Sequence, residues 1–456
     1  MDTKKLRQKI LDLAIHGKLV PQDPNDEPAS VLLERIKVEK EQLIKEGKIK
    51  RSRKSAKTSD TPHYEQVKLE VPNSWYMVSV SDLFLLNPKS ELDDNMKVGF
   101  IPMALVEDGF SGNHFYEERT WKDVKRGYCH FQNGDIGIAK ISPCFENRKS
   151  TIFKNLPNTY GAGTTELVIL RPIKVYTKFY LYLFKSDWYV KEGTKYFKGV
   201  VGQQRVHKEI FTDLHIPLPP FAEQQRIVEE IEYWFALIDQ IEQDKSDLQT
   251  AIRQTKSKIL DLAIHGKLVL QNPNDEPASE LLKRINPKAE ITCDNGHYPN
   301  LPNGWVVTPM QTLCSLTDGE RQSEIERVNL DVKYLRGERE TKTLTAGRYT
   351  PANTLLILVD GENSGEVFRT PIEGYQGSTF KLLSINDNMN TDYVLQVINL
   401  HRKTLRENKV GSAIPHLNKK LFKAIEVPIP PYKEQQRIVN AINRAFQQLD
   451  IITGSL

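Results

Sequence analysis

The sequence has few cysteines and no long apolar run, and both shortages exclude whole classes of protein. Its four cysteines are widely spaced and form no Cys-x-x-Cys pair, so they predict neither a disulfide framework nor a zinc site. No segment approaches the apolar length needed to cross a bilayer, and the charged stretch 1–20 lacks the continuous apolar core of a signal peptide. We therefore expect a cytoplasmic protein without membrane contact.

Catalytic motifs are missing as well. The chain has no Gly-x-x-x-x-Gly-Lys-Ser/Thr loop for nucleotide phosphates and no grouping of His, Cys and acidic residues for a metal. LPPF at 218–221 and IPPY at 429–432 resemble the motif with which amino-methyltransferases grip a flipped base, but Leu218 and Ile429 cannot accept a hydrogen bond from an amine. His16 and His265 each precede a glycine at a predicted helix end, so we interpret them as helix caps. We expect a chain that is not a catalyst by itself and binds no metal or cofactor.

Length and charge constrain the remaining possibilities. A chain of 456 residues is too long for one ordinary core, so we expect two or more domains. The hydrophobic fraction of 39% and the charged fraction of 27% are usual for a globular protein. A net charge of +4 is too small to identify a nucleic-acid binder, so any DNA-binding surface must come from local clusters of Lys and Arg.

The chain contains two copies of the same flanking segments. KILDLAIHGKLV at 9–20 recurs unchanged at 258–269, and PNDEPAS follows in both copies. HIPLPPFAEQQRIV at 215–228 matches EVPIPPYKEQQRIV at 426–439. Weaker echoes lie between these anchors, such as VGQQRVH and VGSAIPH. Shared ends around dissimilar middles predict a duplicated scaffold that carries two different inserts.

A long helix is predicted between the inserts, because 221–265 has no interior Pro or Gly. About 45 residues at ~1.5 Å each would form a rod of roughly 65 Å. Its predicted coiled-coil seam has eleven heptad positions, of which nine are apolar: Ile227, Ile231, Trp234, Ile238, Ile241, Lys245, Leu248, Ile252, Thr255, Ile259 and Leu262.

The two ends of the chain repeat the two halves of this helix. The C-terminal seam corresponds to the beginning of the central helix and the N-terminal seam to its end, with Ile438, Ile442, Ala445, Leu449 and Ile452 in the first and Thr3, Leu6, Ile10 and Leu13 in the second. We therefore expect a circularly permuted repeat with pseudo-two-fold symmetry. The expected fold class is α+β, with two globular domains held apart by two long antiparallel coiled-coil helices.

The inserts combine strand and helix patterns. GDIGIAKI, STIF, ELVILRP, TLLILVD and TFKLLSI predict strands. TKFYLYLFKSDWYVKEG and TDYVLQVINLHRKTLREN each predict a helix. Before the first insert, VLLERIKVEKEQLIKEG also predicts a helix. It is followed by the basic stretch KIKRSRKSAK, which is either a solvated linker or a sequence-independent phosphate contact.

Polar and basic side chains gather in predicted loops at matching places of the two inserts. Arg, Gln and Asn pair bidentately with guanine and adenine edges, so this set favours DNA binding, although any one of its members could simply be solvated. The candidate DNA-binding residues are Lys140, Arg148, Lys149, Gln203, Gln204, Arg205, Arg336, Arg339, Lys342, Asn363, Ser364, Ser412 and Lys419.

The circular duplication, the Pro-Pro-x-x-Glu-Gln-Gln-Arg-Ile-Val helix starts and the LDLAIHGKL helix ends together resemble type I restriction-modification specificity subunits. The resemblance implies double-stranded DNA as ligand, with each variable domain reading one half of a bipartite asymmetric site. It also implies two copies of an S-adenosylmethionine-dependent adenine methyltransferase as partners, and a translocating restriction subunit that uses ATP and Mg²⁺. The repeated EQQRIV segments would be equivalent docking sites, with Gln224, Gln225, Arg226, Gln435, Gln436 and Arg437 as candidate partner-binding residues.

The expected organisation follows from the repeat. A helical region and basic linker at 1–61 precede a first target-recognition domain at 62–217. The central helical region at 218–296 leads to a second target-recognition domain at 297–428 and a terminal helix at 429–456. Family members of another layout carry the first helix and its basic tail at the C-terminus. Two alternatives stay open: a coiled-coil scaffold without DNA specificity, and a stand-alone nuclease or methyltransferase, against which the missing motifs argue.

Overall fold

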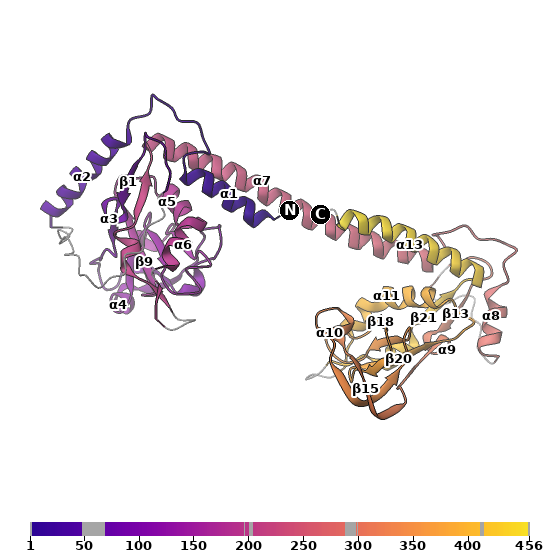
Figure 1. The fold of residues 1–456 in the computed structure, drawn as a ribbon. Helices are drawn as coiled ribbons and strands as arrows, with labels where there is room; N and C mark the ends of the chain where they lie inside the picture. Colours follow the sequence, from indigo (N-terminus) through magenta and orange to yellow (C-terminus); the bar gives the residue numbers. More distant parts are fainter. Residues whose placement is uncertain are drawn as a thin grey trace. The chain divides into compact units, whose positions relative to one another are not determined.

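The structure is a computed structural model that describes residues 2–47, 69–195, 197–199, 204–287, 298, 300–410 and 415–454. The chain forms two compact units, Met1–Gln243 and Asp244–Leu456. The boundary between the units lies inside the long helix α7 (Phe221–Ile264) (Figure 1). The expectation that 221–265 forms one uninterrupted helix is therefore confirmed.

Unit 1 combines short strands with helices. Its helices, apart from α7, are α1 (Thr3–Ile15), α2 (Ala29–Lys45), α3 (Val80–Leu83), α4 (Trp121–Val124), α5 (Thr177–Phe184) and α6 (Asp187–Thr194). Its strands are β1 (Tyr76–Ser79), β2 (Phe84–Leu86), β3 (Lys97–Ile101), β4 (Glu117–Thr120), β5 (Cys129–Gln132), β6 (Ile136–Ala139), β7 (Ser150–Ile152), β8 (Tyr160–Gly163), β9 (Leu167–Pro172), β10 (Phe197–Lys198), β11 (Arg205–Val206) and β12 (His215–Leu218). Two four-stranded sheets have the orders β2-β9-β6-β7 and β4-β3-β8-β5, and β1 pairs with β12.

Unit 2 repeats part of this plan. Its helices are α8 (Ala278–Ile285), α9 (Met310–Leu313), α10 (Val332–Leu335), α11 (Thr391–Glu407), α12 (Lys419–Ala424) and α13 (Tyr432–Gly454). Its strands are β13 (Val306–Pro309), β14 (Cys314–Thr317), β15 (Arg321–Leu330), β16 (Thr343–Thr350), β17 (Leu355–Leu358), β18 (Val367–Arg369), β19 (Gly374–Gln376), β20 (Phe380–Ile385) and β21 (Glu426–Ile429). The four-stranded order β14-β20-β17-β18 corresponds to the first sheet of unit 1, whereas β15, β16 and β19 pair with one another.

Each half of α7 packs against a terminal helix that runs in the opposite direction. In unit 1, Arg7 of α1 donates to Glu242 late in that half of α7 (3.0 Å), while Gln22, just after α1, bonds Glu223 at the beginning of α7. In unit 2, Lys256 lies 2.5 Å from Asp450, near the end of α13. Both pairings bury apolar side chains of α7 in the core of the corresponding unit.

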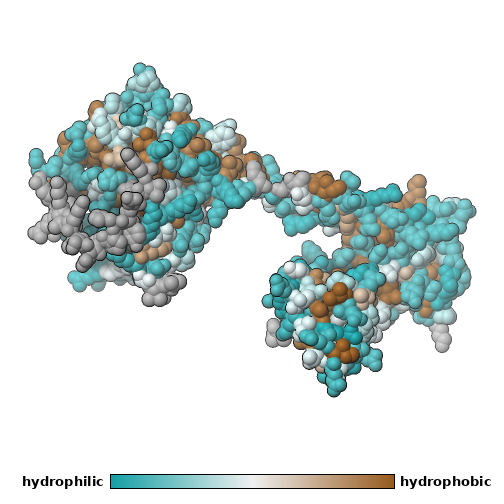
Figure 2. All heavy atoms as spheres, in the orientation of Figure 1, coloured by the Kyte–Doolittle hydropathy of each residue, from teal (hydrophilic) through white to brown (hydrophobic). Residues whose placement is uncertain are grey.

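The predicted seam of α7 is wrong at three of its nine apolar positions. Trp234, Ile241 and Leu248 remain 42%, 42% and 39% exposed. Phe235 enters the core in place of Trp234, because the edge contacts that its ring makes with Phe110 and Tyr182 lie on that side of the helix. Apolar side chains therefore reach the surface along the helical segments (Figure 2). The heptad pattern predicts only the face of α7 that packs against another helix. In the structure the globular domain also packs against α7, and it shifts the buried face toward Phe235.

The predicted strands in the inserts and the single helix α11 are confirmed. The segment predicted as one helix at 177–193 instead forms α5 and α6. Lys185 is fully buried at the break, and its Nζ donates to the carbonyls of Gly109 (2.8 Å) and Arg148 (3.0 Å). The hydroxyl of Ser186 then caps α6 by accepting from Tyr189 N. Tertiary contacts of Lys185 and a local cap together interrupt the helical pattern.

Candidate functional site

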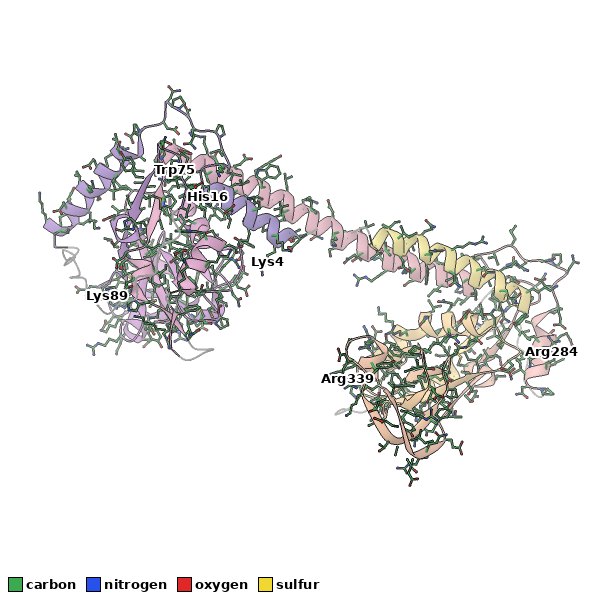
Figure 3. The ribbon with its side chains drawn as sticks, in the orientation of Figure 1. Lys4, His16, Trp75, Lys89, Arg284 and Arg339 are labelled. Carbon is green, nitrogen blue, oxygen red and sulfur yellow. The ribbon has the colours of Figure 1, made fainter. Side chains whose placement is uncertain are left out.

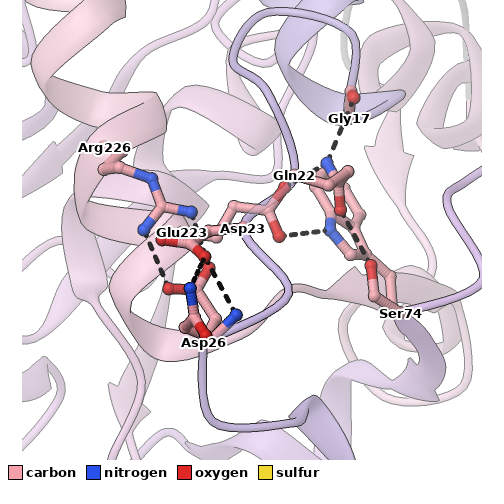
Figure 4. Close-up of polar contacts among 9 residues, drawn as sticks. Gly17, Gln22, Asp23, Asp26, Ser74, Glu223 and Arg226 are labelled. Atoms are coloured by element: carbon pink, nitrogen blue, oxygen red, sulfur yellow. Dashed lines mark hydrogen bonds and ion pairs between the residues drawn. The ribbon is translucent and has the colours of Figure 1, made fainter.

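The repeated segments meet in a buried junction at the beginning of α7 (Figure 4). Trp75 donates its indole N–H to Oε2 of Glu223 across 2.9 Å, and Gln22 donates to the other carboxylate oxygen. The Glu223 side chain is almost fully buried, and this burial raises the pKa of its carboxyl. Trp75 and His16, labelled in Figure 3, lie at this end of unit 1. The junction joins α1, the strand β1 and α7.

The same junction is present in unit 2, where the corresponding residues of the second copy make the same contacts. Trp305 donates to Oε2 of Glu434 across 3.2 Å, and Gln271 donates to Oε1 across 3.1 Å. Burial likewise raises the pKa of Glu434. The paired strands beside the junctions also match, because Tyr76 faces Leu218 in β1–β12 and Val306 faces Ile429 in β13–β21.

Glycine is required at one point of each junction. Gly17 and Gly266 follow the helix-ending His16 and His265 and have φ angles of +63° and +65°. A Cβ at Gly17 would lie 2.4 Å from Cγ of Pro72, and at Gly266 2.3 Å from Cγ of Pro302. The interpretation of the two histidines as helix caps fits their geometry, because each ring Nδ1 lies within hydrogen-bond distance of a helix carbonyl, 2.7 Å for His16 and 2.8 Å for His265.

The EQQRIV residues divide into an inner and an outer set. Gln224 is fully buried, accepting from Tyr176 N (2.9 Å) and donating to Pro219 O (2.9 Å). Gln435 makes the same two bonds, with Asn390 N (3.0 Å) and Pro430 O (2.9 Å). The expectation that these two glutamines face a partner does not fit, because both side chains are used to hold the domain onto its helix.

The arginines of the same segments form ion pairs within their own junctions. Arg226 binds Asp26 through both Nη atoms, at 2.9 and 2.6 Å, and Asp26 belongs to the repeated PNDEPAS segment. Arg437 lies 2.7 Å from Asp275 in the second copy. Arg226 holds the pKa of the Asp26 carboxyl below its ordinary value. Of the six candidate partner-binding residues, Gln225 and Gln436 are the exposed ones.

In unit 1 the structure brings Lys140 and Arg205 together. Both line a pocket of about 350 Å³. Lys198 and Lys208, two basic residues that sequence reasoning missed, line it as well. Arg205 pairs with Glu166, at 2.8 Å from Nη2 to Oε1, which lowers the pKa of that carboxyl. Basic side chains of β10, β11 and the end of β6 therefore share one surface.

Other candidate residues of unit 1 are tied to the interior. Arg148 donates to the carbonyl of Lys185 (3.0 Å) and pairs with Asp187, so its side chain is only 12% exposed. Lys149 donates to the carbonyls of Met103 (3.3 Å) and Val106 (2.9 Å). A DNA-binding role for these two side chains does not fit these contacts.

Gln204 is anchored at the base of its loop, where its carbonyl accepts from Ser142 N (2.8 Å). Lys140 O accepts from Val206 N (2.8 Å) beside it. The same frame recurs in unit 2, where Pro415 O accepts from Gly361 N (2.8 Å) and Val359 O from Leu417 N (2.7 Å). The candidates Gln203 and Ser412 lie outside the described residues, as does KIKRSRKSAK at 48–57.

The candidates of unit 2 occupy several places. Lys342 and Lys419 are exposed, and Arg336 pairs with Glu366. Asn363 is partly buried, whereas Ser364 is fully buried, which does not fit a base-contacting role. Arg339, labelled in Figure 3, pairs with Asp331 near α10.

Arg339 also lines a pocket of about 700 Å³ together with Arg321, Lys333 and Arg348. Sequence reasoning missed these three basic residues, because β15 and β16 were not among the predicted strands and no local pattern links residues on facing strands.

Within the described ranges, no three His, Cys, Asp or Glu side chains are grouped so that they could hold a metal ion. None of the helices in those ranges combines the length and the apolar character needed to cross a membrane.

These features define a duplicated mixed helix–strand protein in which two similar junctions carry two different domains. A family-wide sequence profile described as the type I restriction modification DNA specificity domain matches residues 72–250 and 302–456. The chain belongs to this family of type I restriction-modification DNA specificity proteins.

Curated relatives carry the same designation. The specificity subunit of type I restriction enzyme EcoAI from Escherichia coli is 43% identical over 375 residues, which are 69% of this chain and 63% of the relative. The specificity subunit of EcoEI, also from Escherichia coli, is 41% identical over 62% of this chain and 54% of the relative. The matched part of this chain thus spans less than two thirds of the length of either relative.

Solved structures support the fold. A chain from work on complex assembly and conformational transition of a type I R-M system is similar with a TM-score of 0.61 at 16% identity, covering 84% of this chain and 93% of that chain. The HsdS subunit of Thermoanaerobacter tengcongensis gives a TM-score of 0.51 at 16% identity, covering 84% and 92%.

Proposed function

We propose that this chain is the non-catalytic DNA-reading subunit of a type I restriction-modification complex. The observation that carries the proposal is the contrast within the repeat. The two junctions use the same Trp–Glu–Gln contacts, whereas the basic surfaces of the two units are built from different residues on different strands. A constant frame that carries two different polar surfaces suits a protein that reads two different half-sites.

Each unit would read one half of a bipartite, asymmetric double-stranded DNA site. In unit 1 the surface around Lys140 and Arg205 supplies basic side chains for this contact. In unit 2 the corresponding role falls to Arg339 and the residues around it. The proposed arrangement of the units is pseudo-two-fold, with α7 and the split pair α1 and α13 as two antiparallel coiled-coil rods.

The helices would dock two copies of an adenine methyltransferase. A row of exposed apolar side chains on α7 supports this role, because exposed apolar groups on a helix mark interaction surfaces. The row consists of Tyr233, Trp234, Leu237 and Ile241, all in unit 1. Leu6 of α1 and Ile451 of α13 add exposed apolar surface to the terminal helices. Gln225 and Gln436 would contribute equivalent polar contacts at the two junctions.

The chemistry would reside on the partners. S-adenosylmethionine would bind the methyltransferase copies, and ATP and Mg²⁺ would serve a translocating restriction subunit. This chain would contribute target choice and bind no cofactor itself.

Mapping methylated adenines in a host that expresses the chain with its methyltransferase tests the proposal. Replacing 297–428 by the domain of another family member should change one half-site and preserve the other, and replacing 62–217 should do the converse. Methylation without sequence preference would indicate a scaffold. Modification or cleavage of DNA by the isolated chain would indicate an enzyme.

A further inference from the structure

Two arginines stand directly opposite each other on neighbouring strands of unit 2. In the antiparallel pair β15–β16, Arg321 is the register partner of Arg348. Like charges at directly opposed positions destabilise a sheet. Asp318 offsets the charge of Arg348, at 2.5 Å from Nη1, but it also binds Lys381. Arg321 has no carboxylate within 4.0 Å among the described residues, so its charge is not balanced within this part of the chain.

The two arginines open onto the same pocket. Its volume is about 700 Å³, and its described lining includes four cationic side chains and one carboxylate, Asp331. That carboxylate is already paired with Arg339. Ser378 and Thr379 add hydroxyl groups to the lining. The pocket is therefore electropositive and rich in hydrogen-bond donors, the chemistry that receives a phosphodiester.

The polar lining favours a phosphate over a base edge. Two amides that could pair bidentately with adenine line the pocket, Asn329 and Gln376. Asn329 donates to Asp331 at 3.1 Å, whereas Gln376 is 8% exposed and donates to Phe380 O at 2.5 Å. Its Oε1 accepts from Gly319 N at 3.1 Å, so both ends of this amide are used inside the domain. The remaining donors include two directly opposed arginines, whose neighbouring positive charges suit a phosphate between them, whereas one arginine is enough to read a guanine edge.

We propose that the pocket between Arg321 and Arg348 holds backbone phosphates of the double-stranded DNA bound by unit 2. This inference rests on the proposed function and assigns the phosphate contacts of the second domain. A bound phosphate lies between the two guanidinium groups and removes their mutual repulsion.

The test measures binding of the full chain to a mixed-sequence duplex of about 40 base pairs as salt is raised. Arg321→Ala and Arg348→Ala should each lower affinity on the order of tenfold near 0.1 M salt and reduce the salt slope by about one. Arg369→Ala is the matched control, because Arg369 lies on β18 of the same unit, is 44% exposed and pairs with Asp392 at 3.6 Å outside the pocket. The control should bind as the unchanged chain does.

Thermal unfolding separates a ligand contact from a structural role. Arg321→Ala should melt at or above the temperature of the unchanged chain, because it removes a like-charge pair and little packing. A lowered melting temperature with an unchanged salt slope would overturn the proposal, and so would equal losses in the control.

Methylation mapping of the chain together with its methyltransferase distinguishes contact with a backbone phosphate from contact with a base edge. Relaxed preference at one base position, with an unchanged salt slope, would assign the pocket to a base edge and overturn the phosphate assignment. If the unchanged chain binds DNA and both variants bind as tightly as it does, the assignment of the pocket fails but the proposed function stands. If neither the unchanged chain nor its complex with the methyltransferase binds DNA, both the assignment and the proposed function fail.

Discussion

The indole nitrogen of Trp75 lies 2.9 Å from Oε2 of Glu223 and donates to it inside a junction of three chain segments. The tryptophan precedes the first paired strand of the domain, and the glutamate belongs to the first turn of α7. The same contact between Trp305 and Glu434 explains why the ends of the repeat are nearly identical while the middles differ. Both members of the pair contribute to joining the domain to the helix.

Trp75→Phe should destabilise unit 1 by about 1–3 kcal/mol, because it leaves a buried carboxylate with one donor fewer. Urea unfolding of the purified chain would measure this loss. Tyr76→Phe is the control, since Tyr76 is 44% exposed and should change stability little. Equal stability of Trp75→Phe and the unchanged chain would show that the junction does not depend on this bond.

Lys185 predicts a pH dependence of stability in the mildly alkaline range. Burial lowers the pKa of its ammonium group to about 7, from the ordinary value of 10.5. Between these values the unfolded chain binds more protons than the folded one, so the contribution of Lys185 to the free energy of unfolding rises with pH. Relative to Lys185→Met, the unchanged chain should gain up to about 1.4 kcal/mol per pH unit above pH 7. Urea midpoints of both proteins at pH 7, 8 and 9 would test this; a constant difference would contradict it.

The exposed apolar row on α7 should be needed for the methyltransferase rather than for folding. Leu237→Lys with Ile241→Lys should lower the amount of co-purified methyltransferase by about half, because the docking site of unit 2 is unchanged, while leaving the melting temperature of the free chain within a few degrees. Val38→Lys on α2 is the matched control, because Val38 is 67% exposed and lies outside the row. Unchanged recovery with the α7 double variant would move the docking surface elsewhere.

Two docking sites predict that the complex contains two methyltransferase copies for each copy of this chain. The repeat supplies each junction with an equivalent exposed glutamine, Gln225 or Gln436. Native mass measurement of the saturated complex should therefore find two methyltransferase copies for each copy of this chain. A single bound copy at saturation would argue against equivalent sites.

The length of α7 should set the spacing of the two DNA half-sites. Four helix-forming residues inserted between Lys245 and Thr250 would lengthen the helix by about 6 Å, which corresponds to one or two base pairs. The non-specific spacer in the methylated site should lengthen accordingly, with both half-sites preserved. A seven-residue insertion keeps the heptad phase and provides a comparison. An unchanged spacer in an active variant would show that the helix is not the ruler.

The sequence by itself determined the duplicated frame and the elements that depend on local pattern. An uninterrupted helix at 221–264, the apolar strands and the glycines after His16 and His265 could be predicted because each depends on neighbouring residues. The repeated segments also predicted a shared role, although the contacts of Gln224 and Gln435 turned out to be internal.

Tertiary structure decided which side chains of these elements are buried and which are brought together. Phe235 is buried instead of Trp234 because the domain covers that side of α7, and Lys185 interrupts a helical pattern because distant carbonyls accept its ammonium hydrogens. Arg321 and Arg348 form one site only because β15 and β16 pair in a particular register. Register depends on the packing of a whole strand face, so the position of a charge along the chain does not show which charge it will meet.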